Sequence, residues 1–254
     1  MNYRLLDPMT RKTLFLSILS LSALFASSGA FATPASLDPE PRLVTYPWMT
    51  LSTWYKMHAE DVELATKGEA KIVFIGDSIT QGWNGRGQKF WDESFSPMGA
   101  VNFGIGGDMT QNLIWRMEYG ATGNLDPNAV VLMIGTNNFA FTEDSPEVIA
   151  AGIVAVVDRL ERSFPNAQIL LFGVFPRSES PDHPLRGKIK RINQIISNLE
   201  NRDRVEYLDI GNRLLESDGR ISKEIMPDFL HLSEKGYQRW ADAVLPWLKE
   251  QVAP

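Results

Sequence analysis

The chain has 254 residues, no cysteine and a formal net charge of −6. Without cysteine it can have no thiol nucleophile, no disulfide and no thiolate metal site. No stretch is rich in lysine and arginine, so the basic footprint of a protein that binds nucleic acid is missing. The length suits one good-sized domain with its own hydrophobic core.

The first 32 residues have the pattern of a secretory signal peptide. A basic start with Arg4, Arg11 and Lys12 precedes an apolar stretch over residues 13–26, and a small-x-small cleavage site ends at Ala32. The alternative is an uncleaved membrane anchor, but the apolar stretch is shorter than the ~20 residues that span a bilayer. We therefore expect cleavage after Ala32, export to the periplasm or the medium, and no stable membrane anchor afterwards. Cleavage would change the net charge from −6 to −8.

The next part of the chain is predicted to form an extended leader, a helix and a strand. Residues 33–47 contain four prolines and are expected to form an extended leader without regular structure. Residues 48–67 carry apolar side chains at helical spacing, which predicts a helix that packs on a sheet. Residues 72–75 are continuously apolar and predict a buried strand. A loop is expected over 83–95, where the aromatic residues suit a core slightly better than a substrate platform.

The rest of the chain alternates short apolar runs with amphipathic segments. Further strands are predicted at 100–103, 129–134, 168–175 and 205–208, and helices at 110–119, from 146 to before Pro165, at 185–199, and after the cap Ser233. Strands that alternate with helices predict an α/β fold with a parallel sheet between two helical layers. The pattern indicates one domain over residues 48–254.

A serine follows the first predicted strand. The strand stops at Gly76 and Asp77, so Ser78 should lie just past its carboxyl end, where open α/β sheets place their ligand sites. The simpler interpretation is a turn with a helix N-cap, and for this tripeptide alone it is the favoured one. Three distant stretches change that balance.

A glycine-rich turn follows the second predicted strand. Gly104, Gly106 and Gly107 suggest a dinucleotide-binding turn, but Met109 stands where the third motif glycine belongs. The motif is weak even when it is complete, so we predict no cofactor.

A histidine and an aspartate stand close together before the last predicted helix. Asp228 and His231 are three residues apart, so in a turn the carboxylate could orient the imidazole, as the base of a serine hydrolase requires. Alone, such a pair more often marks a surface turn. No metal site is predicted, because the other histidines, His58 and His183, fall in a helix and a loop and are interpreted as packing or surface residues.

Together these turns supply the groups that acyl transfer needs. Ser78 could attack, His231 could take its proton, and Asp228 could hold His231. The backbone amides of Ser78 and Gly107 and the side chain of Asn137 could bind the oxyanion. A glycine at 107 would keep a side chain from crowding that amide away from the substrate.

The same residues carry a resemblance to a known family. The chain resembles the GDSL, or SGNH, hydrolases in four blocks with the family's order and spacing: Gly76-Asp77-Ser78-Ile79, Gly107, Gly135-Thr136-Asn137-Asn138 and Asp228-Phe229-Leu230-His231. The segments NFGIGGD, IGTNN, FPR followed by PLR, and DFLHL are similar to the catalytic subunits of intracellular platelet-activating-factor acetylhydrolase. The similarity spans roughly residues 48–250.

The resemblance implies a fold and a set of roles. The fold would be a flavodoxin-like three-layer α/β/α sandwich with strand order 2-1-3-4-5 and no cofactor. Ser78 would be the nucleophile with Asp228 and His231 as its partners, and Ser78, Gly107 and Asn137 the oxyanion hole. Side chains at the positions of Ile79, Thr136 and Leu230 close the acyl side of the site in the acetylhydrolases. Leu232 replaces the usual proline after the histidine, as it does in that branch.

The sequence therefore predicts an exported serine esterase that removes acetyl or other short acyl groups, with carbohydrate as the expected alcohol part. The export signal does not fit an intracellular lipid-mediator enzyme, so the acetyl-ester chemistry is carried over and the lipid substrate is not. Two alternatives stay open: a lipase or lysophospholipase acting on longer chains, and a non-catalytic carbohydrate-binding protein with this fold. The expected partner is a small-molecule or carbohydrate ester, and the sequence makes no prediction of oligomeric state.

Overall fold

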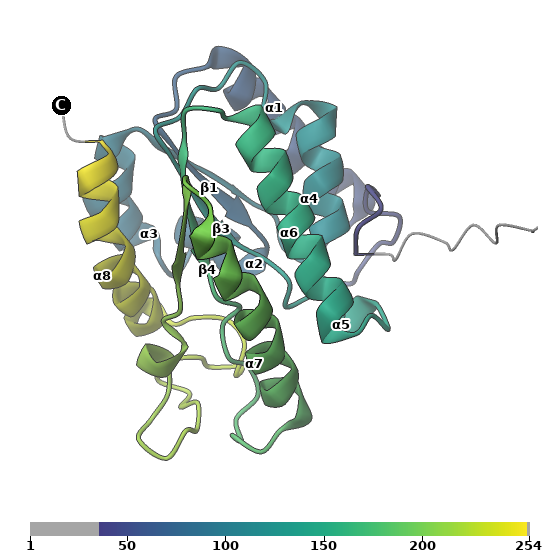
Figure 1. The fold of residues 1–254 in the computed structure, drawn as a ribbon, viewed down its shortest axis with the longest axis vertical. Coiled ribbons are helices and arrows are strands. Elements are labelled where there is room, and N and C mark those ends of the chain that lie inside the picture. Colours follow the sequence, from purple (N-terminus) through teal and green to yellow (C-terminus); the bar gives the residue numbers. More distant parts are fainter. Residues whose placement is uncertain (1–35, 253–254) are drawn as a thin grey trace, which may run out of the picture. The chain divides into compact units, whose positions relative to one another are not determined.

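The computed structural model describes residues 36–252, and the predicted signal peptide lies outside them. In this part of the chain five parallel strands form one sheet in the order β2-β1-β3-β4-β5 (Figure 1). The strands are β1 (Ile72–Gly76), β2 (Ala100–Gly104), β3 (Ala129–Met133), β4 (Gln168–Phe172) and β5 (Val205–Leu208). The predicted flavodoxin-like sheet and strand order are confirmed.

Helices pack on both faces of the sheet and make it the middle of three layers (Figure 1). One face is covered by α1 (Leu51–Lys67), α4 (Thr110–Arg116), α6 (Pro146–Ser163) and α7 (Pro184–Ile196). The other is covered by α8 (Glu234–Gln251) and the short helical segments that include α3 (Gln88–Phe90). Two short helices, α2 (Ser78–Gln81) and α5 (Asn138–Phe141), start near the carboxyl ends of β1 and β3.

The core divides according to the alternation of side chains along the strands. Val73 and Ile75 of β1 pack with α4 and α6, whereas Ile72 and Phe74 pack with α8 and the residues before β2. Every residue of β1 and β3 is buried, as a continuously apolar run in a doubly covered sheet predicts. The rigid centre of the sheet therefore positions whatever follows β1 and β3.

The first helix begins later than predicted, at Leu51 instead of Trp48. Thr50 is its N-cap and accepts a 3.1 Å hydrogen bond from the Thr53 amide. The residues before it are held by an isolated antiparallel bridge between Tyr46 and Met49. Trp48 therefore belongs to a turn at the end of the leader.

The loop expected over residues 83–95 is instead a series of short helical turns. A 3-10 turn at Gly82–Asn84, α3 and a π-helical turn at Trp91–Phe95 follow one another. Trp83 and Phe95 are fully buried against the α8 side of the sheet. The core interpretation of these aromatic residues is thus correct, and burial of their rings organises the segment.

Four other elements end earlier than predicted, and one of them, β3, ends a single residue early at Met133. The helix predicted to end at 119 ends at Arg116, because Tyr119 and Gly120 leave helical dihedral angles in the following π-turn. The strand predicted to end at 175 ends at Phe172, and the amide of Val174 donates to the Asn193 side chain instead. The helix predicted to end at 199 passes into a 3-10 turn after Ile196.

Candidate active site

The turn after β1 holds Ser78 at the carboxyl edge of the sheet. Asp77 caps α2, because its Oδ1 accepts a 2.9 Å hydrogen bond from the Ile79 amide. Complete burial raises the pKa of Asp77 to about 7, although the Ile79 hydrogen bond opposes this shift. At the other side of the turn, the buried Tyr237 hydroxyl donates to the Ile79 carbonyl at 2.6 Å. The turn is therefore a helix N-cap, as the simpler interpretation held, and it leaves Ser78 only half-buried at the start of α2.

Ser78, His231 and Asp228 lie in a continuous chain of hydrogen bonds. Ser78 Oγ is 2.9 Å from His231 Nε2, and His231 Nδ1 is 2.7 Å from Asp228 Oδ2. The second carboxylate oxygen of Asp228 accepts from the amides of His231 at 2.8 Å and Leu230 at 3.1 Å. This is the arrangement of nucleophile, base and orienting acid that activates a serine.

The loop that carries the histidine is fixed to the end of β4. Phe229 has a left-handed φ of 60° and Ser178 one of 71°, and the Ser178 amide donates to the Phe229 carbonyl at 2.9 Å. Partial burial opposes ionisation of Asp228, but the hydrogen bonds from the His231 ring and amide lower its pKa below the ordinary value. The His231 side chain is 37 % exposed, so the ring is open to a substrate.

Three possible oxyanion donors follow the carboxyl ends of three neighbouring strands, Ser78 after β1, Gly107 after β2 and Asn137 after β3. Within residues 36–252, the amides of Ser78 and Gly107 donate to no other backbone group. Asn137 Nδ2 donates one hydrogen to the Asp108 carbonyl at 3.0 Å, which leaves its second hydrogen for a ligand. An amide pair with a side-chain amide is the usual composition of an oxyanion hole.

The structure explains Gly107 differently from the sequence interpretation. Its φ is +77°, and a Cβ there would lie 2.5 Å from Trp48 Cη2 and 2.8 Å from an Arg42 nitrogen. Glycine is thus required by the backbone conformation and by residues packed behind the turn.

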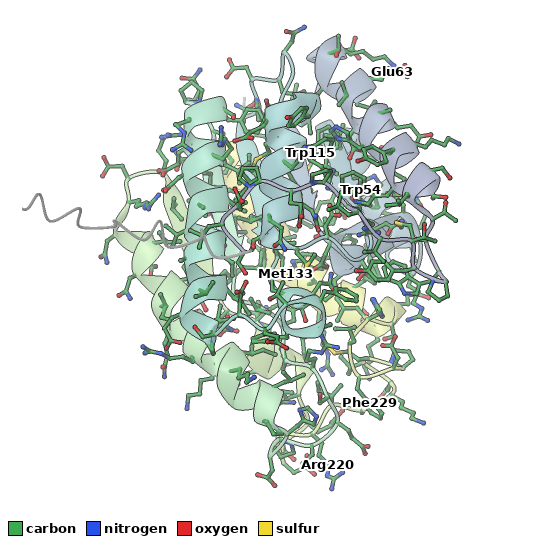
Figure 2. All side chains as sticks on the ribbon, turned by 90° about the vertical axis from the view of Figure 1, so that its right-hand side faces the viewer. Trp54, Glu63, Trp115, Met133, Arg220 and Phe229 are labelled. Atoms are coloured by element: carbon green, nitrogen blue, oxygen red, sulfur yellow. The ribbon has the colours of Figure 1, made fainter. Side chains whose placement is uncertain are left out.

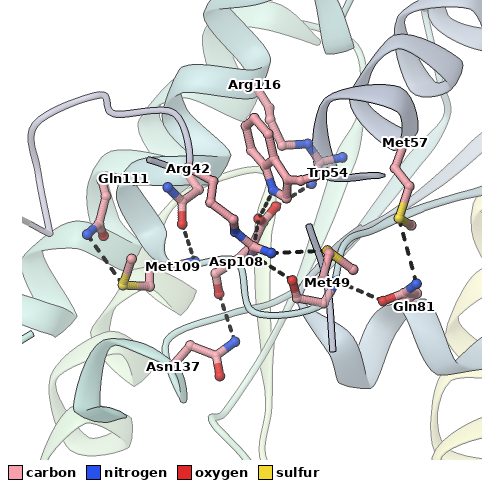
Figure 3. A network of polar contacts seen from close by, with 12 residues as sticks. Arg42, Met49, Trp54, Met57, Gln81, Asp108, Met109, Gln111, Arg116 and Asn137 are labelled. Carbon is pink, nitrogen blue, oxygen red and sulfur yellow. Dashed lines mark hydrogen bonds and ion pairs between the residues drawn. The ribbon is translucent and has the colours of Figure 1, made fainter. Parts of the chain in front are cut away.

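A buried network behind this turn was not predicted from the sequence (Figure 3). Asp108 is fully buried and accepts hydrogen bonds from Trp54 Nε1 at 2.6 Å and Arg116 at 2.7 Å. Arg116 is also fully buried and pairs with Asp61 of α1. A buried charge needs such pairing, so the network fixes the turn that carries Gly107.

The leader contributes a buried arginine to the same network (Figure 3). Arg42 donates to the Gly106 carbonyl at 2.6 Å and lies 3.3 Å from Asp108 Oδ1. Its guanidinium carbon is also 5.7 Å from the centre of the Trp48 ring. The leader was expected only to be extended, and no local pattern of its sequence indicates this role.

The predicted acyl-side residues lie at the ends of the same turns. Ile79 and Thr136 are buried, and Leu230 is partly buried against the α8 side of the core. Arg177, which follows β4, donates to the Thr136 carbonyl at 3.1 Å and lies 3.3 Å from its hydroxyl. Arg177 is a second residue whose position the sequence interpretation did not assign, although it belongs to the FPR segment.

The two other histidines have structural positions, as predicted. His58 is buried on α1, with its ring 5.1 Å from Trp115 of α4, and Figure 2 shows Trp115 beside Trp54. His183 caps α7, because its Nδ1 accepts from the Leu185 amide at 3.2 Å. In residues 36–252 no three potential metal ligands gather at one place, and no helix there has the length and apolarity to cross a bilayer.

Comparison with known proteins identifies the family of the chain. The model of the GDSL-like lipase/acylhydrolase family matches residues 74–239. The platelet-activating factor acetylhydrolase IB subunit alpha1 of Bos taurus is 39 % identical over 185 residues, covering 72 % of this chain and 77 % of that protein.

Two solved structures share the fold. A GDSL-like lipase of Bacteroides thetaiotaomicron has a TM-score of 0.64 at 21 % identity, covering 77 % of this chain and 97 % of its own. A carbohydrate acetylesterase of Sinorhizobium meliloti has a TM-score of 0.54 at 19 % identity, covering 71 % of this chain and 99 % of its own. The chain belongs to the GDSL-like lipase/acylhydrolase family and is a carboxylic-ester hydrolase.

Proposed function

We propose that the protein is an exported acetylesterase that removes acetyl or similarly short acyl groups from carbohydrate. The observation that carries the chemistry is the hydrogen-bonded chain from Ser78 Oγ through His231 to Asp228. Export is proposed from the pattern of residues 1–32 alone.

The reaction proceeds in two steps. Ser78 Oγ attacks the acyl carbon while His231 Nε2 takes its proton, and Asp228 stabilises the imidazolium. The amides of Ser78 and Gly107 and the Asn137 side chain hold the oxyanion. The alcohol leaves with the proton from His231, and the acyl group stays on Ser78. Water, deprotonated by His231, then attacks the acyl-enzyme, and the carboxylic acid leaves as Ser78 recovers its proton.

The preference for a short acyl group is proposed from the side chains beside the triad. Ile79 follows Ser78 and is buried, and Thr136 precedes Asn137 and is held by Arg177. Leu230 precedes His231 in a loop that is tied to Ser178. Side chains fixed in this way leave little room for a longer chain, because overpacking typically costs ~1–3 kcal/mol. The acetylhydrolase name of the Bos taurus relative supports the same acyl class.

The test is hydrolysis by the wild type and by Ser78→Ala. Wild-type protein should release acetate from acetylated oligosaccharides and should prefer nitrophenyl acetate to nitrophenyl octanoate. Ser78→Ala should lower both rates by several orders of magnitude, with an unchanged circular dichroism spectrum. Retention of more than about a tenth of the activity would refute the nucleophile, since triad removal costs far more. Faster hydrolysis of octanoate would favour the lipase alternative.

A further inference from the structure

A groove lies between the leader and the end of α5. It is next to the turn after β2 that carries Gly107, which we call the oxyanion turn. Its volume is about 410 Å³, within the range of small-molecule sites. The leader lines one wall, and Met109 and the segment from Phe141 to Asp144 line the other. Met109 directly follows Asp108, and α5 begins directly after Asn137. Two walls of the groove are therefore built from the segments that directly follow the turns with the oxyanion donors.

Aromatic rings gather where the groove meets the oxyanion turn. Tyr46 and Trp48 stack with a centroid distance of 5.0 Å and an interplanar angle of 4°, and Tyr46 also lies 4.8 Å from Phe141. Trp48 is nevertheless 57 % exposed and Phe141 40 % exposed. Because a Cβ on Gly107 would meet the Trp48 ring, that ring directly borders the oxyanion turn. Contiguous exposed apolar surface with polar residues around it is a feature of ligand-binding grooves.

Arg42 of the leader holds the rings of Tyr46 and Trp48 in place. The Arg42 guanidinium carbon lies 5.3 Å from the Tyr46 ring centre and 5.7 Å from that of Trp48. The same guanidinium is fixed by Gly106 and Asp108. Two aromatic rings in contact with a buried cation gain attraction and lose little freedom when a ligand arrives.

The charges of the groove select the kind of ligand. Glu40, Glu143 and Asp144 line it, and Arg42 is the one basic residue among the described residues that do. The Arg42 guanidinium already contacts the Gly106 carbonyl and the Asp108 carboxylate of the buried network. Apart from Arg42, the charged groups that a phosphate headgroup would meet here are all carboxylates, which repel it. Sugar hydroxyls can instead donate to carboxylates while the apolar faces of the sugar rings stack on aromatic rings.

We propose that this groove binds glycosyl units of an uncharged oligosaccharide, which form the alcohol part of the ester. Phe141 in the groove and the neighbouring Trp48, which stacks on the groove residue Tyr46, form the stacking platform. This inference rests on the proposed carbohydrate esterase function. It assigns to residues 40–48, which are the end of the leader and the turn with Trp48, the recognition of the substrate beyond the ester bond.

The first experiment compares selectivity in Trp48→Ala, Phe141→Ala and the matched control Tyr119→Ala. Tyr119 is also an exposed aromatic residue, 61 % exposed, but it stacks on Trp115 and neither lines the groove nor contacts the Tyr46 ring that joins Trp48 to Phe141. For each protein, kcat/KM is measured on acetylated xylohexaose and on nitrophenyl acetate. The ratio of kcat/KM on acetylated xylohexaose to kcat/KM on nitrophenyl acetate measures recognition of the glycan. We expect this ratio to fall at least tenfold in the two groove variants, Trp48→Ala and Phe141→Ala, and to stay at the wild-type value in Tyr119→Ala. An unchanged ratio in both groove variants would overturn the inference.

A second experiment separates this inference from the proposed function. Unacetylated xylohexaose, mannohexaose and cellohexaose are each titrated calorimetrically into Ser78→Ala and into Ser78→Ala with Trp48→Ala. Binding of at least one of them that weakens tenfold or more in the double variant supports the groove, even if wild-type protein releases no acetate from any glycan. The inference is overturned if none of the three oligosaccharides binds, or if one binds with the same affinity with and without the Trp48 side chain. This holds even if the esterase is active. Lysophosphatidylcholine is titrated in parallel, and binding that depends on Trp48 would also overturn it.

Discussion

Asn137 Nδ2 donates a 3.0 Å hydrogen bond to the backbone carbonyl of Asp108. The side chain of Asp108 is meanwhile fully buried and bonded to Trp54, Arg116 and Arg42 (Figure 3). One residue thus links an oxyanion donor from the end of β3 to a charged network between α1, α4 and the leader. The amide of Asn137 is oriented before a substrate arrives, which is what electrostatic stabilisation of a transition state requires.

The first prediction concerns Asn137→Ala. The loss of one preorganised donor should lower kcat by about 10²- to 10³-fold. KM should change less, because the oxyanion exists mainly in the transition state. Steady-state kinetics on nitrophenyl acetate measures both values. A normal kcat with a large rise in KM would instead identify Asn137 as a ground-state contact.

The second prediction concerns Arg42, which acts through the oxyanion turn. Arg42→Ala removes the hydrogen bond to the Gly106 carbonyl, so the neighbouring Gly107 amide should lose its fixed position. Misplacement of a donor by about 1 Å can cost up to about 100-fold in rate, and we expect kcat for nitrophenyl acetate to fall by roughly 10- to 100-fold. Arg42→Lys should recover only part of this loss, because a single ammonium cannot reproduce the guanidinium fork.

A purely structural role for Arg42 would have a different signature. Arg42→Ala would then lower the melting temperature while kcat, measured well below that temperature, stayed at the wild-type value. The matched control is Arg220→Ala, an exposed arginine that pairs with Glu179 far from the network, and it should change neither quantity.

The strands and the turns that carry the candidate site could be predicted from the sequence because both have short-range signatures. Continuous apolar runs marked β1 and β3, and glycine and polar residues marked where they ended. In a parallel sheet those ends share one edge, so Ser78 and Asn137 had to lie near each other. The pairing of Asp228 with His231 is likewise local, three residues apart.

The network behind the site has no such signature. Arg42 and Asp108 are 66 residues apart, and neither stands in a periodic pattern that indicates a partner. A buried arginine in a proline-rich leader is indistinguishable in sequence from an exposed one. The helical turns over residues 82–95 were missed for a related reason. Their order comes from burial of Trp83 and Phe95 against a distant helix, and not from local helix propensity.

The third prediction is a pH dependence of stability caused by His58. Burial, and next the charge of Arg116, lower the pKa of His58 to about 4, although a hydrogen bond to the backbone of Tyr119 opposes the shift. In the unfolded chain the imidazole titrates near ~6.5. The contribution of the neutral ring is therefore fully present above pH ~6.5 and is lost as the pH falls toward 4.

Urea denaturation at several pH values between 7 and 4.5 checks this, with His58→Phe as the comparison. The variant keeps a ring beside Trp54 and Trp115 but cannot titrate. The charged and titratable groups beside His58 are Arg116 and its partner Asp61, and both are present in the two proteins. Burial raises the pKa of Asp61 to about 7, although Arg116 opposes the shift, so its titration contributes to both slopes. The free energy of unfolding should thus fall less steeply with acidification in His58→Phe. Equal slopes in the two proteins would show that His58 does not contribute.

The last prediction concerns acyl selectivity and the Leu230 side chain. Leu230 lies between Phe229, which has a left-handed φ, and His231, which is hydrogen-bonded to Asp228. The side chain cannot move far to admit a longer acyl chain without displacing the base. A penalty of ~1–3 kcal/mol for overpacking corresponds to a preference of roughly 5- to 150-fold in kcat/KM for acetyl over butyryl esters.

Leu230→Ala should enlarge the acyl pocket and reduce that preference, mainly by raising kcat/KM for butyryl and hexanoyl esters. A nitrophenyl ester series from acetyl to octanoyl measures it. Leu215→Ala provides the control, because Leu215 is also a partly buried leucine on the α8 side of the core but is not adjacent to a triad residue. Its substitution removes similar packing and should leave the order of substrates unchanged. If both variants reduced the preference for acetyl esters equally, the effect would come from general loosening of the core. The Leu230 side chain beside His231 would then not determine the acyl length that the site accepts.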